Sequence, residues 1–193
     1  MEWVQAENVA FLVSDNTELN SSIARKLGIP FVGCMSHRLA LAITEHLETL
    51  QFEPLLKRIH QLMVKLDSSK MRALMRLQKC DLAPVQRNST RWSSTFNMLE
   101  RYFRVEFEPA VVQIGRIRAN FSKVEYQMRY NNWIPNTQER VLLYELYETM
   151  IKLNSATVYL QKADLNLVGA SFAISSLIDD LNDNSWSRYL LLN

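Results

Sequence analysis

Two short apolar segments, each followed at once by polar residues, constrain the fold of this chain more than any other feature. Residues 9–13 form the first segment and residues 29–33 the second. The first is followed by Ser14-Asp15-Asn16 and the second by a Cys-Met-Ser-His sequence, residues 34–37. Short apolar runs bounded by polar residues are typical of strands buried on both faces of an α/β sheet. Binding and chemistry usually collect at the carboxyl ends of such strands.

The rest of the chain is predicted to be mostly helical. Between the two strands, Leu19, Ile23 and Leu27 recur at a spacing of four, which places them on one helical face. Gly28 then suits the helix end. The chain has only 4 Gly and 5 Pro, too few for the many turns of a sandwich or barrel. Further apolar stripes predict helices over residues 36–50, 54–66, 69–80, 96–107, 137–160 and 167–181.

Composition limits the setting in which the chain works. The 22 Lys and Arg nearly balance the 20 Asp and Glu, and a net charge of +2 does not by itself indicate a nucleic-acid or membrane partner. Cys34 and Cys80 cannot form a disulfide framework, and the N-terminus has no signal-peptide pattern, so we expect a protein that is not secreted and is cytoplasmic by default. No apolar run approaches the roughly 18 residues that a membrane span needs.

Asp15 is the first candidate for chemistry because it directly follows a predicted strand. A carboxylate held at a strand end is a natural ligand for Mg²⁺, which prefers oxygen donors and needs a rigid anchor. The alternative is that Asp15 or Asn16 only caps the helix that follows.

Cys34 and His37 form the second candidate group. Their spacing is that of half a zinc site, and the two residue types also occur in Cys–His catalytic pairs. The other possible ligands, His46, His60 and Cys80, are scattered along the chain, and His46 and His60 are expected to face solvent. The structural alternative is a buried Cys34 followed by a histidine in the first turn of a helix.

Arg91 and Trp92 stand side by side in a polar loop before a predicted helix. Arginine pairs with phosphate through its forked guanidinium and tryptophan stacks on bases, so the pair fits a nucleic-acid contact. Equally, Trp92 would anchor the helix to the core while Arg91 pairs with a carboxylate.

A basic segment lies between residues 57 and 79. It carries a single acidic residue, Asp67, and either forms a solvated helix face or binds an acidic partner such as nucleic acid. Its basic residues are Lys57, Arg58, Lys65, Lys70, Arg72, Arg76 and Lys79.

Three motifs in this order resemble the hAT superfamily of DNA transposases, the hobo and Activator type. The resemblance extends from about Phe11 to Phe103. The motifs are Asp15-Asn16-x-x-x-Asn20, then Cys34-x-x-His37-Arg38-Leu39-x-Leu41-Ala42, then Thr90-Arg91-Trp92-Ser93-Ser94-Thr95-x-x-Met98-Leu99-x-Arg101.

The resemblance implies an RNase H-like catalytic domain that cuts and transfers DNA strands. In that family an Asp-Asp-Glu triad holds two divalent metal ions, Mg²⁺ or Mn²⁺. Asp15 would be the second carboxylate of the triad, and Cys34 and His37 would lie near the scissile phosphate. Trp92 would stack on a flipped or hairpin-end base while Arg91 holds the backbone. The implied partner is DNA, and the implied location is the nucleus.

The chain departs from the family pattern in two places. The first Asp of the triad is expected upstream of Met1 and the Glu beyond Asn193, so one carboxylate of three is present and tight metal binding is not expected. We therefore predict a truncated or relic transposase fragment that is inactive alone. Residues 1–104 would be a partial RNase H-like core with two to three short strands, and residues 105–193 a helical insertion-like region. Exposed hydrophobic residues near the C-terminus also predict self-association.

The alternative function comes from a different class. It is a mostly helical module that binds nucleic acid or protein through the basic 57–79 surface, chiefly Lys57, Arg58, Lys70, Arg72 and Arg76.

Overall fold

The computed structural model describes residues 9–49, 51–77, 80–88, 91–107 and 133–181. Among the predicted features, Leu50, Lys79, Thr90 and the C-terminal hydrophobic residues lie outside these ranges. The chain divides into two compact units. Unit 1 comprises residues 1–46 and 155–193, and unit 2 comprises residues 47–154. The predicted division after residue 104, which separates a partial catalytic core from an insertion, stays a prediction.

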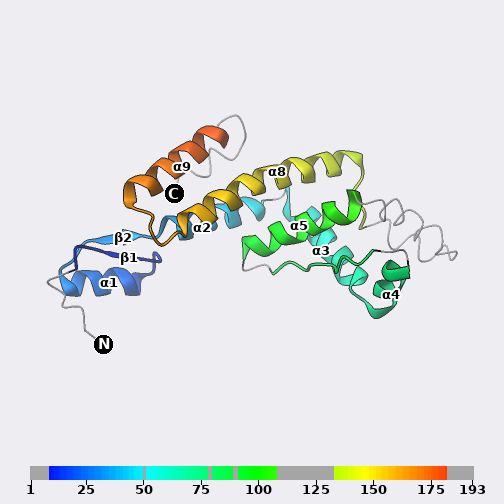
Figure 1. The fold of residues 1–193 in the computed structure, drawn as a ribbon, viewed down its shortest axis with the longest axis horizontal. Helices are drawn as coiled ribbons and strands as arrows, with labels where there is room; N and C mark the ends of the chain where they lie inside the picture. Colours follow the sequence, from blue (N-terminus) through cyan, green and yellow to red (C-terminus); the bar gives the residue numbers. More distant parts are fainter. Residues whose placement is uncertain (1–8, 50, 78–79, 89–90, 108–132, 182–193) are drawn as a thin grey trace. The chain divides into compact units, whose positions relative to one another are not determined.

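Unit 1 begins with a β-α-β arrangement (Figure 1). Strand β1 (Leu12–Ser14) is followed by helix α1 (Glu18–Leu27) and strand β2 (Phe31–Gly33). The two strands pair in parallel, with Leu12 opposite Phe31 and Ser14 opposite Gly33. Both predicted strands are thus present, although β1 begins three residues later than the apolar run.

Local chemistry sets the ends of α1. Thr17 is the N-cap, and its hydroxyl accepts the backbone N–H of Asn20, so neither Asp15 nor Asn16 occupies the cap position itself. At the other end Gly28 adopts a left-handed conformation with φ of 68° and donates its N–H to the carbonyls of Ala24 and Arg25. A side chain with a Cβ is strained in that conformation, which explains why glycine ends this helix.

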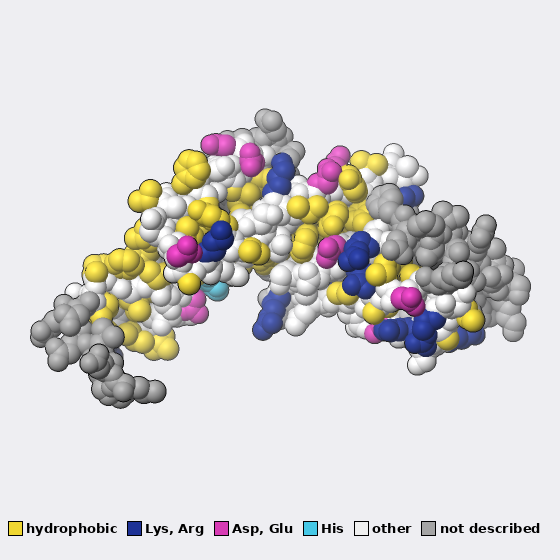
Figure 2. Space-filling model, viewed as in Figure 1, with side chains coloured by type: hydrophobic (Ala, Val, Ile, Leu, Met, Phe, Trp, Pro, Cys, Tyr) yellow, Lys and Arg dark blue, Asp and Glu magenta, His cyan; other side chains and the backbone are white. Residues whose placement is uncertain are grey.

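The structure contradicts the prediction that the first strand is buried on both faces. Phe11 and Val13 are 43% and 51% exposed, so β1 is not buried on both faces among the described residues. The predicted apolar stripe of α1 also faces outward, because Leu19 is 70% exposed and Leu27 51% exposed, whereas Ala24 is buried. Figure 2 shows hydrophobic side chains at the surface over β1 and α1.

Three helices complete the described part of unit 1. Helix α2 (Met35–Leu47) follows β2, the last residues of α8 (Thr137–Leu160) belong to this unit, and α9 (Leu167–Leu181) follows. Leu39, Ala42 and Ile43 of α2 are buried, as are Leu177 and Leu181 of α9. The prediction that His46 faces solvent is wrong, because its side chain is only 3% exposed.

Unit 2 is a helical assembly built from α3 (Glu53–Leu66), α4 (Ser69–Leu77), α5 (Trp92–Phe107) and the first part of α8. Helix α3 packs against α4 and α5. Leu55, Ile59, Leu62 and Leu66, which form the apolar stripe of the helix predicted over residues 54–66, are all buried. Pro54 lies in its first turn, where a missing N–H costs nothing.

Aromatic rings join α5 to α8 within unit 2. Phe96 stacks on Tyr147 with centroids 6.0 Å apart. The Phe103 ring contacts the rings of Tyr144 and Tyr147, with centroids 5.6 and 5.1 Å away. Such pairs add to the stability gained by burying apolar area. The aromatic run of α5 is therefore core packing.

The predicted class, an α/β chain that is mostly helical, is confirmed in the described residues. They contain two parallel strands and no third. No helix among the described residues is both long enough and apolar enough to cross a membrane.

Candidate strand-edge site

The parallel pairing of β1 and β2 brings two of the sequence motifs to one edge of the sheet. Ser14 and Gly33, the last residues of the two strands, are register partners. The backbone N–H of Cys34 then donates to the carbonyl of Ser14 at 2.7 Å. Asp15 and Cys34 consequently follow adjacent strands at their carboxyl ends, as expected for a strand-end site.

The Asp15 carboxylate is held by its own loop. Oδ1 accepts hydrogen bonds from the Thr17 hydroxyl at 3.2 Å and from Asn20 Nδ2. Asn20 Nδ2 also approaches the Ser14 hydroxyl at 2.8 Å. These contacts tie the end of β1 to the first turn of α1, so Asp15 has a structural role whether or not it binds a ligand. Asn20 was part of the sequence motif, and its role here is to orient Asp15.

Cys34 and His37 lie where strand gives way to helix. Cys34 is half-buried, and its carbonyl accepts the N–H of Arg38 at 3.1 Å, which is the first hydrogen bond of α2. His37 is half-buried in the first turn of that helix. The thiol has no disulfide partner.

The residues at this edge do not fit the metal sites that the sequence suggested. Among the described residues, no group of three or more His, Cys, Asp or Glu side chains could hold a metal ion. A two-ion Mg²⁺ or Mn²⁺ centre needs several carboxylates, and a structural zinc site needs four ligands. Asp15, Cys34 and His37 alone supply neither set.

A polar hollow lies beside the same edge, and the sequence motifs did not predict it. It has a volume of about 830 Å³ and is lined by α1 on one side and by β2 and the start of α2 on the other. We call it the α1 hollow. Its polar lining residues are Asn16, Thr17, Glu18, Ser21, Ser22, Arg25 and Arg38. The recurrence of Glu18, Ser21, Ser22 and Arg25 at helical spacing is a signal that could have indicated it.

Gly33 shapes the floor of the α1 hollow. A Cβ at this position would collide with the side-chain amide of Asn16, so glycine is what allows Asn16 to lie against β2. Gly33 and Asn16 therefore pack directly against each other.

Arg91 and Trp92 belong to unit 2, whereas Asp15, Cys34 and His37 belong to unit 1. Trp92 is only 7% exposed, and its ring lies 6.5 Å from that of Phe96. Arg91 is exposed at the surface. The burial of Trp92 corresponds to the anchoring alternative, because stacking on a base requires an accessible ring face.

Much of the predicted basic surface is paired with carboxylates inside unit 2. Arg58 binds both carboxylate oxygens of Glu139, Arg72 lies 3.0 Å from Asp67, and Lys57 lies 3.4 Å from Glu53. Lys70 and Arg76 are exposed. Figure 2 shows Lys and Arg side chains gathered over α4.

Comparison with known proteins yields no match to any family model, curated protein or solved structure.

Proposed function

We propose that this chain is part of a hAT-type DNA transposase and that the edge carrying Asp15, Cys34 and His37 derives from its DNA-cutting pocket. The activity of the ancestral enzyme would be metal-dependent cleavage and transfer of DNA strands. A nuclear location and a DNA partner are parts of the same proposal.

One observation carries the proposal. Two motifs that are nineteen residues apart, at Asp15 and Cys34, follow the ends of adjacent parallel strands, and the Cys34 N–H binds the Ser14 carbonyl. Sequence order alone does not require this adjacency, but a DNA-cutting pocket at a strand edge does. The ordered series of three sequence motifs is the other support.

The chemistry of the described residues argues against cleavage by this chain alone. A two-ion mechanism uses one ion to activate the attacking hydroxyl and the other to stabilise the leaving oxygen. Asp15 is the one carboxylate that directly follows the strands at this edge, and Asn20 and Thr17 already hydrogen-bond to it. We therefore propose retained DNA binding without strand cleavage.

The experiment combines binding and cleavage on the same purified chain. A labelled DNA duplex is titrated by fluorescence anisotropy at several salt concentrations, and is then incubated with Mg²⁺ or Mn²⁺ and resolved on a denaturing gel. We expect salt-sensitive binding and intact DNA. Metal-dependent cutting that disappears in Asp15→Ala would overturn the inactive assignment, and lack of any DNA binding at low salt would overturn the proposed function.

The alternative, a binding module based on the basic 57–79 surface, has weaker support. Arg58, Arg72 and Lys57 each have a carboxylate neighbour, which lowers the positive potential they offer to a partner. Arg76 is exposed and has no ion pair among the described residues, so it is the residue to test. Loss of DNA binding in Arg76→Gln would favour this surface over the strand edge.

A further inference from the structure

The α1 hollow combines positive charge with hydroxyl groups that are not engaged elsewhere. Within the part of the chain that the structure describes, the Arg25 side chain has no ion pair or hydrogen bond. The hydroxyls of Ser21 and Ser22 likewise have no hydrogen-bond partner there. In this respect Arg25 differs from Arg58 and Arg72 of unit 2, whose guanidinium groups are paired with carboxylates.

Two elements contribute the positive charges. Arg25 comes from the last turn of α1, and Arg38 comes from the first turns of α2. Both line the same hollow, together with the Asn16 amide. Guanidinium groups from two directions and several hydroxyl or amide donors form the donor set that proteins use for phosphate oxygens.

The carboxylate in the lining does not cancel this charge. Glu18 is seven residues before Arg25 on α1, which corresponds to about 10 Å along a helix axis. It lies in the first turn of α1, whereas Arg25 and the adjacent Lys26 lie in the last. The lining holds two arginines and one glutamate, and Arg25, which has no ion pair among the described residues, lies at the opposite end of α1 from that glutamate.

We infer that the α1 hollow binds a phosphate group through Arg25 and Arg38, assisted by the hydroxyls of Ser21 and Ser22. The identification of that phosphate as part of a DNA backbone rests on the proposed function. The hollow adjoins the strand edge, because Asn16 and Gly33 border both, while Arg25 lies at the end of α1 away from Glu18.

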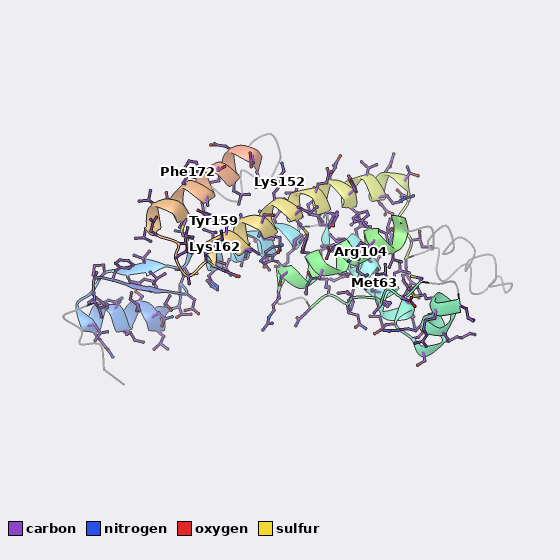
Figure 3. The ribbon with its side chains drawn as sticks, in the orientation of Figure 1. Met63, Arg104, Lys152, Tyr159, Lys162 and Phe172 are labelled. Atoms are coloured by element: carbon purple, nitrogen blue, oxygen red, sulfur yellow. The ribbon has the colours of Figure 1, made fainter. Side chains whose placement is uncertain are left out.

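The test removes the two charges of the hollow and compares the result with removal of two charges elsewhere. Arg25→Gln/Arg38→Gln is the test variant. Arg104→Gln/Lys152→Gln is the matched control, since both are exposed side chains that Figure 3 places on α5 and α8, outside the hollow. Ser21→Glu is an independent variant that keeps both arginines but introduces a carboxylate. Circular dichroism first establishes that all variants fold.

Two titrations distinguish a DNA phosphate from a free one. The first measures affinity for duplex DNA as a function of salt, and the second measures pyrophosphate binding by calorimetry. We expect the test variant to bind DNA more weakly and its plot of log affinity against log salt to be shallower by about 1, since the hollow neutralises one phosphate and each phosphate contributes about 0.9. Ser21→Glu should also weaken binding, and the control should change the slope by less than half as much as the test variant.

The outcomes separate this inference from the proposed function. If the wild type binds DNA and the test and control variants lose affinity equally, the phosphate site is excluded while DNA binding stands. If the wild type binds pyrophosphate through Arg25 and Arg38 but does not bind DNA, the phosphate site stands and the transposase proposal fails. Absence of both kinds of binding would overturn both.

Discussion

His46 shows at the scale of one residue how burial changes chemistry. Its side chain is 3% exposed on α2, and burial lowers the pKa of the imidazole from 6.5 to about 4. The cause is desolvation, which disfavours the charged form. The histidine is therefore neutral in the folded chain at neutral pH.

This burial predicts that acid destabilises the fold. Between pH 6.5 and 4 the unfolded histidine takes up a proton that the folded one does not, so the free energy of unfolding falls as pH falls through this window. The expected loss between pH 7 and 5 is about 2 kcal/mol. Urea unfolding at the two pH values measures it, and His46→Met should flatten the dependence. An unchanged pH dependence in that variant would contradict the assignment.

The Arg58–Glu139 pair links residues 81 positions apart within unit 2. The two side chains form a forked contact, with oxygen–nitrogen distances of 2.5 and 3.1 Å, and Arg58 also donates to the carbonyl of Ile134 at 3.2 Å. The hydrogen bond from Arg58, then that from the Asn136 backbone, lowers the pKa of the Glu139 carboxyl.

A double-mutant cycle with Arg58→Met and Glu139→Gln should give a coupling free energy of about 1 kcal/mol at neutral pH, a modest value because both side chains are partly exposed. Since the carboxyl pKa is lowered in the folded state, the coupling is present above the unfolded pKa and is lost as pH falls through the folded one. Unfolding curves at neutral and acidic pH test this. A coupling that persists after the carboxylate is protonated would show that charge is not its source.

At the scale of elements, the start of α5 supports the anchoring role for Trp92. Trp92 is the first residue of the helix, is nearly buried, and contacts Phe96, whose ring stacks on Tyr147 of α8. Removing it takes away part of the packing that holds α5 in unit 2.

Trp92→Ala should lower the free energy of unfolding by about 3 kcal/mol, as expected for loss of a buried aromatic side chain. Trp92→Phe should cost clearly less, and Arg91→Ala should change stability by less than about 0.5 kcal/mol because Arg91 is exposed. Chemical denaturation of the three variants provides the measurement. Full stability in Trp92→Ala, together with loss of DNA binding, would instead support the base-stacking role.

The helices could be predicted where their signals are local. Pro54 and Gly28 mark helix ends and the apolar period of α3 marks its inward face through neighbours in the sequence, and these predictions agree with the structure. The outward orientation of Leu19 on α1 could not be predicted in the same way. Helical spacing predicts that apolar residues share one face of a helix. Whether that face is buried depends on packing by elements that are distant in the sequence.

The candidate site was likewise predictable only in the parts that depend on local sequence. Strand-end polar residues indicated Asp15 and Cys34, and the parallel register explains why they come to one edge. The pairing of Arg58 with Glu139 and the α1 hollow both depend on contacts between separate elements, so no local motif reveals them. For the same reason the basic 57–79 segment appeared more available in sequence than it is in the structure.

At the scale of the whole molecule, the described part of unit 1 exposes several large apolar side chains of β1 and α1, and exposed apolar patches often mark contacts between molecules. Phe11 and Val13 of the β1 segment and Leu19, Ile23 and Leu27 of α1 are each at least 40% exposed. These residues give a physical basis for the predicted self-association, separate from the C-terminal residues on which the sequence prediction relied.

Replacing Leu19 and Leu27 with glutamine therefore tests whether the apolar face of α1 is free to contact another molecule or is buried by the same chain. Because both side chains are exposed, the double variant should keep the free energy of unfolding within about 0.5 kcal/mol of the wild type and should weaken concentration-dependent association in sedimentation equilibrium. Leu77→Gln is the control, since Leu77 is 76% exposed on α4 in unit 2 and should leave association unchanged. A large loss of stability in the double variant would mean that another part of the same chain covers this face, and the apolar stripe of α1 would then be internal packing and not a contact between molecules.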